Sequence, residues 1–99
     1  MANFIKQVST ATSGTISLSD TKQDVVLIHD AGSLAITLTI TFPASPIDGQ
    51  QLRIASTLGV TTLTLSSGLS IIGVITTIAA GGFASYIYEV GQNKWFRIG

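Results

Sequence analysis

The sequence contains no cysteine and has few charged residues. The missing thiol excludes disulfide bonds, thiolate metal sites and a cysteine nucleophile, and it leaves the redox compartment open. Lys, Arg, Asp and Glu make up 10% of the 99 residues, against about 25% in a typical soluble domain. The five basic and five acidic residues cancel, so the chain has no basic surface for nucleic acid or anionic lipid.

Long apolar runs are also missing. No run approaches the roughly 20 residues that a membrane-spanning helix needs. The N-terminal residues carry one lysine and no long apolar core, unlike a signal peptide. We therefore expect neither nucleic acid nor membrane as a partner, and we expect residues 1–99 to be one complete, free-standing domain.

The low charge has a consequence for assembly. A folded monomer of this mass exposes roughly 5,400 Å², which ten charged side chains cannot cover in the usual way. Serine and threonine fill part of the gap. We therefore expect an obligate oligomer, or a subunit fixed in a larger assembly.

Period-two alternation predicts an all-β fold. In residues 33–42 the alternation places Leu34, Ile36, Leu38, Ile40 and Phe42 on one face and Ala35, Thr37, Thr39 and Thr41 on the other. The threonine face suits a wall against another subunit. Further strands are expected at 15–18, 24–29, 50–56, 60–66, 69–78, 83–90 and 94–98, with a bulge or break at Gly73.

Glycine, aspartate and serine separate these runs, and this spacing indicates an antiparallel sandwich, barrel or short β-prism. Residues 24–29 are nearly all apolar, so we expect them to be buried on both faces. A short helix is conceivable only at the N-terminus, through Gln7. The similarity between AITLTI and TTLTLS is too loose to be interpreted as a repeat.

Residues for catalysis are scarce, and we expect no enzyme. The single histidine, His29, precedes Asp30, and with eleven serines a Ser, His and Asp set carries no information without a G-x-S-x-G turn. We interpret His29 as a strand end and Asp30 as a turn residue. The carboxylates lie mostly in turn contexts, and zinc, calcium and phosphate-binding patterns are absent. We expect no catalytic residue, cofactor or metal site.

Three aromatic residues leave two readings open. Tyr86, Tyr88 and Trp95 can form a platform on which a sugar stacks, or they can pack in the core and at an interface. The packing reading is favoured, because alternating strands place such rings in packed layers.

Residues 33–99 resemble a β module that recurs in virion proteins of tailed bacteriophages. The segment FPASPIDGQQLRI, residues 42–54, is followed by threonine-rich strands, an I-x-G element and a closing hairpin with a Tyr and a Trp. The matching residues are Pro43, Pro46, Asp48, Gly49, Gln50, Ile54, Ile72, Gly73, Tyr88, Trp95 and Gly99. Residues 1–32 match nothing in that module.

The resemblance implies a structural virion protein that is assembled in the host cytoplasm. Its form would be a homotrimeric capsid decoration or cement subunit that contacts the major capsid protein or another virion protein. The alternative is a tail or head fibre tip that binds a host glycan or receptor; an enzyme and an unrelated β protein are less favoured. We expect residues 1–12 to include an N-terminal arm. The candidate subunit or capsid contacts are Phe4, Ile5, Tyr86, Tyr88, Trp95 and Phe96.

Overall fold

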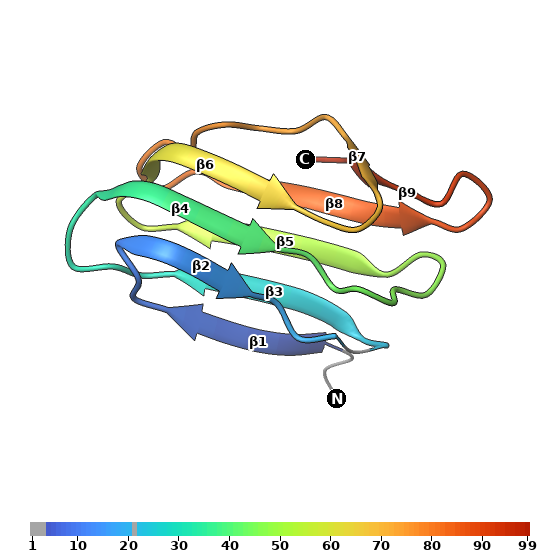
Figure 1. Ribbon diagram of the computed structural model, residues 1–99. Coiled ribbons are helices and arrows are strands. Elements are labelled where there is room, and N and C mark those ends of the chain that lie inside the picture. The colour runs from blue at the N-terminus through green and yellow to red at the C-terminus, as the bar shows by residue number, and fades with distance from the viewer. Residues whose placement is uncertain (1–3, 21) are drawn as a thin grey trace.

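A computed structural model describes residues 4–20 and 22–99 of the chain (Figure 1). This part of the chain contains nine strands and no helix, which confirms the all-β prediction. The strands are β1 (Phe4–Ser9), β2 (Ser13–Ser17), β3 (Asp24–His29), β4 (Ala35–Thr41), β5 (Gln51–Ser56), β6 (Val60–Ser66), β7 (Ser70–Ile72), β8 (Phe83–Glu89) and β9 (Lys94–Arg97). The short N-terminal helix does not form over residues 4–7, which belong to β1; residues 1–3 lie outside the described residues.

The strands form two sheets that lie one over the other (Figure 1). The long sheet has the order β1-β3-β5-β8-β9-β7, and the short sheet has the order β2-β4-β6. The chain alternates between the sheets, so that β1–β2, β3–β4 and β5–β6 are three successive coils. Strands of successive coils pair in parallel, and the fold is a β-solenoid.

The antiparallel sandwich, barrel or prism is therefore a wrong prediction. Among the described strands, antiparallel pairing joins only β5 to β8 and β8 to β9. The physical reason lies in the connections. From β1 to β6 each turn carries the chain to the opposite sheet, so a strand pairs with the strand two places along the chain. Turn residues mark where strands end but do not distinguish this route from a hairpin.

Stacked coils repeat the same sequence pattern. Residues 37–41, TLTIT, pair in register with residues 62–66, TLTLS. The similarity that we did not interpret as a repeat is therefore a real structural one. In-register stacking of like residues is the basis of solenoid stability, because each coil buries its apolar side chains against its neighbours.

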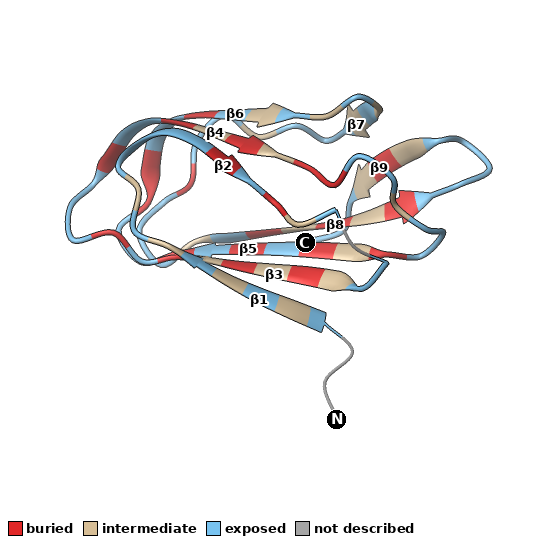
Figure 2. Cartoon of the chain, turned by 60° about the horizontal axis from the view of Figure 1, so that its bottom comes forward, coloured by how far each residue is buried: buried red, intermediate tan, exposed pale blue. Residues whose placement is uncertain are grey.

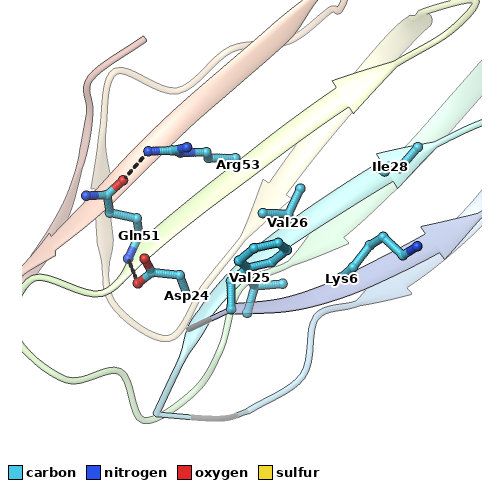
Figure 3. Close-up of a pocket in the computed structure, with 8 residues that line it drawn as sticks. Lys6, Asp24, Val25, Val26, Ile28, Gln51 and Arg53 are labelled. Atoms are coloured by element: carbon cyan, nitrogen blue, oxygen red, sulfur yellow. Dashed lines mark hydrogen bonds between the residues drawn. The ribbon is translucent and has the colours of Figure 1, made fainter. Parts of the chain in front are cut away.

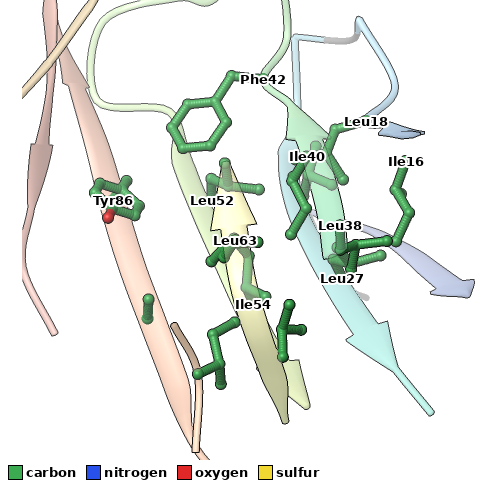
Figure 4. Packing of buried hydrophobic residues seen from close by; sticks show 14 of the residues in the cluster. Ile16, Leu18, Leu27, Leu38, Ile40, Phe42, Leu52, Ile54, Leu63 and Tyr86 are labelled. Atoms are coloured by element: carbon green, nitrogen blue, oxygen red, sulfur yellow. The ribbon is translucent and has the colours of Figure 1, made fainter. Parts of the chain in front are cut away.

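The core lies between the two sheets, and buried residues alternate with exposed ones along the strands of both layers (Figure 2). Leu27, Leu52 and Ile54 of the long sheet pack with Leu38, Ile40 and Leu63 of the short sheet (Figure 4). The alternation slips once in β4. Ala35 and Leu38 are both buried with two exposed residues between them, so the chain turns a corner there, and Leu34 and Ile36 are exposed instead of facing the core.

The N-terminal end of the solenoid is closed by Gln7. Its Nε2 donates to the Ser17 carbonyl oxygen at 3.2 Å, and its Oε1 accepts the Ser19 backbone N–H at 2.7 Å. The side chain thus spans from β1 to the end of β2. Of the residues expected to form an N-terminal arm, Phe4–Ser9 form β1, which pairs with β3 along its whole length; residues 1–3 lie outside the described residues.

The C-terminal segment closes the opposite end. After β7 the chain breaks at Gly73, as predicted, and residues 76–78 run along β6 through backbone hydrogen bonds such as that from Leu63 N–H to Thr76 O. The chain then enters β8 and β9, which extend the long sheet beyond β5. These elements cover the third coil, as terminal segments of solenoids must.

Candidate interaction surfaces

The outer side of the long sheet, which we call the long-sheet face, combines apolar side chains with five of the chain's ten charged residues. It consists of the side chains that point away from the core on β1, β3, β5, β8, β9 and β7: Phe4, Lys6, Val8, Asp24, Val26, Ile28, Gln51, Arg53, Ala55, Phe83, Ser85, Ile87, Glu89, Lys94, Phe96 and Ile72. One row across four strands is wholly apolar: Val8, Ile28, Ala55 and Phe83. Phe83 is 66% exposed, more than any other large hydrophobic residue described.

A hollow of about 340 Å³ lies on this face over β1, β3 and β5 (Figure 3). Phe4, Val26 and Ile28 provide apolar lining, and Lys6 and Arg53 bring two cations to its walls. The Arg53 guanidinium donates to Gln51 Oε1 at 2.8 Å. Residues 24–29 were expected to be buried on both faces. Instead Val25 and Leu27 are buried, while Val26 and Ile28 are only half-buried beneath this hollow.

The outer side of the short sheet carries a regular array of hydroxyl groups, which we call the hydroxyl face. The parallel register stacks three rows, made of Ser13, Thr37 and Thr62, of Thr15, Thr39 and Thr64, and of Ser17, Thr41 and Ser66. All nine residues are exposed or half-buried. Strand geometry spaces them about 4.8 Å apart across strands and about 6.6 Å along them. Thr37, Thr39 and Thr41 of the predicted threonine face thus form the middle strand of a larger uncharged surface, whereas Ala35, which was expected on the same face, is buried.

The residues that we predicted as contacts divide into two groups. Phe4 and Phe96 lie on the long-sheet face in one row across the sheet, and Ile5 is half-buried at the end of the core. Tyr86, Tyr88 and Trp95 are buried in the core. For those three residues the prediction of a surface contact is wrong, and with it the sugar-stacking platform. The packing reading is the one that the structure supports.

These buried rings form a compact cluster with Phe42. The centroid of the Phe42 ring lies 5.3 Å from that of Trp95, in an edge-on arrangement, and 5.3 Å from that of Tyr86. The centroids of the Tyr88 and Trp95 rings are 5.5 Å apart. Such tilted pairs add favourable contacts to the area they bury. The Tyr86 hydroxyl donates to the Gly73 carbonyl oxygen at 2.9 Å. Burial raises the pKa of the Tyr86 phenol, and the nearby Arg97 charge opposes part of that rise.

The residues that carry the phage resemblance gather around this cluster. The segment 42–50 leads from β4 to β5, with Phe42 and Pro43 buried. Gly49 N–H donates to the Tyr88 carbonyl oxygen, and the Asp48 carboxylate accepts the Val90 N–H at 3.0 Å. The Tyr88 hydroxyl donates to Asn93 Oδ1. The shared residues therefore hold the closing hairpin onto the solenoid.

His29 has a structural place inside the solenoid. Its Nε2–H donates to the Ala11 carbonyl oxygen at 2.6 Å, because a carbonyl oxygen only accepts. In the neutral ring Nδ1 then accepts the Ser56 hydroxyl at 2.9 Å, and Ser56 Oγ accepts the Gly59 N–H. This chain of bonds joins all three coils.

The structure brings Ser56 and His29 together but keeps the Asp30 carboxylate away from both. Ser56 and His29 meet, but both are buried, and no substrate reaches either atom. Asp30 faces away and accepts the Thr57 hydroxyl at 2.9 Å. A nucleophile with an exposed oxygen and an oriented base is therefore not assembled at His29.

The carboxylates serve the backbone, as their turn contexts predict. Asp20, Asp24, Asp48 and Glu89 each accept a main-chain N–H, from Ser45, Gln51, Val90 and Gln92. Each joins a turn or strand end to a neighbouring segment. Within residues 4–20 and 22–99 no three His, Cys, Asp or Glu side chains come close enough to hold a metal ion.

Comparison of the chain with known protein families, with curated proteins and with solved structures gave no match. The virion module thus stays a prediction from the sequence. Across the described residues there is no helix long and apolar enough to cross a membrane.

Proposed function

We propose that this protein is a structural subunit of a bacteriophage virion, of the capsid decoration or cement type. The observation that carries the proposal is the pair of outer surfaces on opposite sides of one solenoid: the long-sheet face, with its row of exposed apolar side chains, and the uncharged hydroxyl face. A subunit with two such surfaces can contact further copies through one and the shell or solvent through the other. The resemblance of residues 33–99 to phage virion modules supports the same assignment.

The mechanism requires burial of apolar surface rather than chemistry. Burying apolar area stabilises an assembly by roughly 25 cal/mol per Å² before the costs of association are deducted. A parallel solenoid suits this task, because the sheet backbone holds its outer side chains in fixed rows. The proposed assembly is a homo-oligomer, with three copies as the resemblance implies, on the major capsid protein or another virion protein.

A fibre tip that binds a host receptor is the second candidate. Tyr86, Tyr88 and Trp95, the residues first considered for it, are buried. The hydroxyl face is the observation that favours it, since rows of Ser and Thr can exchange hydrogen bonds with a glycan. A glycan array separates the two candidates, because a cement subunit recognises no sugar.

Co-sedimentation tests the proposal directly. The purified chain is mixed with heads of the phage that encodes it, prepared without this protein, and the copies bound per particle are counted. Saturation at hundreds of copies is expected for a subunit that decorates a lattice. Saturation at a handful of copies would favour a fibre, and no binding to heads or tails would refute a virion role.

A further inference from the structure

We infer that the long-sheet face is a self-association surface, on which Phe83 of one copy enters the hollow over β1, β3 and β5 of a second copy. The inference takes up the oligomer that the proposed function requires and assigns it a surface and an anchor residue. The argument rests on the shape of the face, its charges and its size.

The shapes of the anchor and the hollow match. Phe83 is two-thirds exposed at the start of β8, where a lone aromatic ring on a flat sheet is poorly accounted for in a monomer. The hollow has a volume of about 340 Å³, and an apolar cavity of about 150 Å³ already holds a benzene ring. An aromatic anchor that fills a pocket on the partner is a recurrent form of an interface hot spot.

The walls of the hollow favour an aromatic guest. Lys6 and Arg53 line it from β1 and β5 on either side of Val26. Asp24 and Gln51 complete its polar lining at the other end of β3 and β5 from Ile28. A cation close to an aromatic ring is attracted to its face, more strongly once water is excluded. Phe4 lines the same hollow and offers a second ring for edge-to-face packing with the incoming Phe83.

The charges on the face permit two copies to meet. Lys6, Arg53 and Lys94 are offset by Asp24 and Glu89 on the same surface, which leaves one net positive charge, so two identical faces repel each other far less than faces of one sign would. Anchor and hollow lie on different strands of the face. Each copy can therefore give its Phe83 and receive another, in a closed pair or a closed ring.

The size of the face is sufficient. Six strands at about 4.8 Å spacing and about 20 Å length give roughly 500 Å² in projection. The relief of the side chains raises the accessible area above that figure. Specific interfaces bury about 600–1,000 Å² on each partner, so a stable association would bury nearly the whole of this face. A second copy is the occupant to which these three observations point.

The first test is the mass of the full chain in solution, measured by light scattering after size exclusion from 1 to 100 µM. A multiple of 10.3 kDa is expected for the wild type. Phe83→Ser removes the anchor and Val26→Lys fills the hollow with a charge; each is expected to weaken association at least about 30-fold. Ile36→Ser is the matched control, because Ile36 is 61% exposed on the short-sheet side of the molecule.

A conservative variant gives a readout that a folding defect does not mimic. Phe83→Trp keeps an aromatic anchor, so its association is expected to persist and its fluorescence emission to shift to the blue as concentration rises. Circular dichroism verifies that each variant is folded. A wild type that stays monomeric at 100 µM would overturn the inference, as would Phe83→Ser or Val26→Lys with wild-type mass, or Ile36→Ser with an equal loss.

The two proposals fail separately. An oligomer that Phe83→Ser dissociates but that does not bind phage heads leaves the self-association surface intact and removes the virion function. Stoichiometric binding to heads by a wild type that is monomeric in solution, and equally by Phe83→Ser, supports the virion function and overturns the surface.

Discussion

His29 and Ser56 occupy equivalent positions in adjacent coils, and His29 Nδ1 lies 2.9 Å from Ser56 Oγ inside the solenoid. Ser9 precedes them in the same row on β1. A row of polar residues thus runs through a mostly apolar interior at one edge of the core. Each polar atom of His29 and Ser56 has a partner, which is the condition under which such a row stabilises rather than weakens a fold.

Ser56→Ala is expected to lower the free energy of unfolding by about 2–4 kcal/mol, because it leaves the Gly59 N–H and His29 Nδ1 buried without partners. Urea unfolding monitored by circular dichroism measures this. Ser66→Ala on the hydroxyl face is the control and is expected to change stability by less than about 0.5 kcal/mol. Equal effects of the two substitutions would show that the His29 network contributes nothing.

Alanine substitutions at Gly59 and Gly14 distinguish the cost of a positive φ from the cost of a steric clash. Both glycines have φ close to +90°, a conformation that costs an L-residue about 1–2 kcal/mol. Only at Gly59 would the new Cβ lie 2.4 Å from a backbone oxygen, that of Ile78, whereas at Gly14 nothing lies within 4 Å. Gly59→Ala is expected to lower the melting temperature clearly more than Gly14→Ala. A smaller loss at Gly59 would contradict the packing of residues 78–80 on this turn.

Alkaline pH is expected to destabilise the wild type through Tyr86. Its pKa is raised in the folded state, so the folded protein holds the phenol proton more tightly than the unfolded chain, whose pKa is about 10. The stability gained is complete below about pH 10 and is lost as pH rises through the raised pKa. Tyr86→Phe removes this dependence, at a cost of about 1 kcal/mol at neutral pH for the lost bond to Gly73.

Denaturant unfolding of both proteins between pH 8 and pH 11.5 tests this. The stability advantage of the wild type over Tyr86→Phe should shrink above about pH 10. An advantage that stays constant over this range would mean that Tyr86 titrates alike in the folded and unfolded chains.

Gln7→Met is expected to loosen the first coil. The substitution keeps the length of the side chain but removes both hydrogen bonds to the end of β2, at a cost of about 1–2 kcal/mol. Hydrogen exchange should quicken in β1 and β2 more than in β5 and β8. Gln92→Met, in the exposed turn before β9, serves as the control. Uniform exchange in both variants would show that Gln7 does not close this end.

The sequence predicted the strands better than their arrangement. Residues 35–41 and 60–66 alternate so regularly that strand formation follows from side-chain periodicity alone. Whether Thr39 pairs with Thr64 in a parallel sheet depends on whether each turn leads the chain to the same sheet or to the opposite one. Turn residues such as Asp30 are compatible with both routes. Parallel stacking is a property of distant segments, which local patterns do not reveal.

The surfaces were predictable only in part. The threonine alternation in residues 37–41 indicated an uncharged outer face, and the low charge of the chain indicated contact surfaces. The aromatic residues misled, because Tyr86, Tyr88 and Trp95 are the types found both in cores and at interfaces. The signal for the apolar outer face was in β3, where Val26 and Ile28 are apolar at the positions that alternate with the buried Val25 and Leu27. Such a strand is apolar on the outside as well.

The in-register stacking of coils has a consequence for how this chain can change over generations. Thr37 and Thr62 stand 25 residues apart and one coil apart. One duplication of a segment of that size would insert a whole coil, lengthening the molecule by about 4.8 Å. Each new coil would add one strand to both outer faces at once while the cross-section stays constant. The length of such a protein and the area of its outer faces are therefore set by a single inherited quantity, the number of coils.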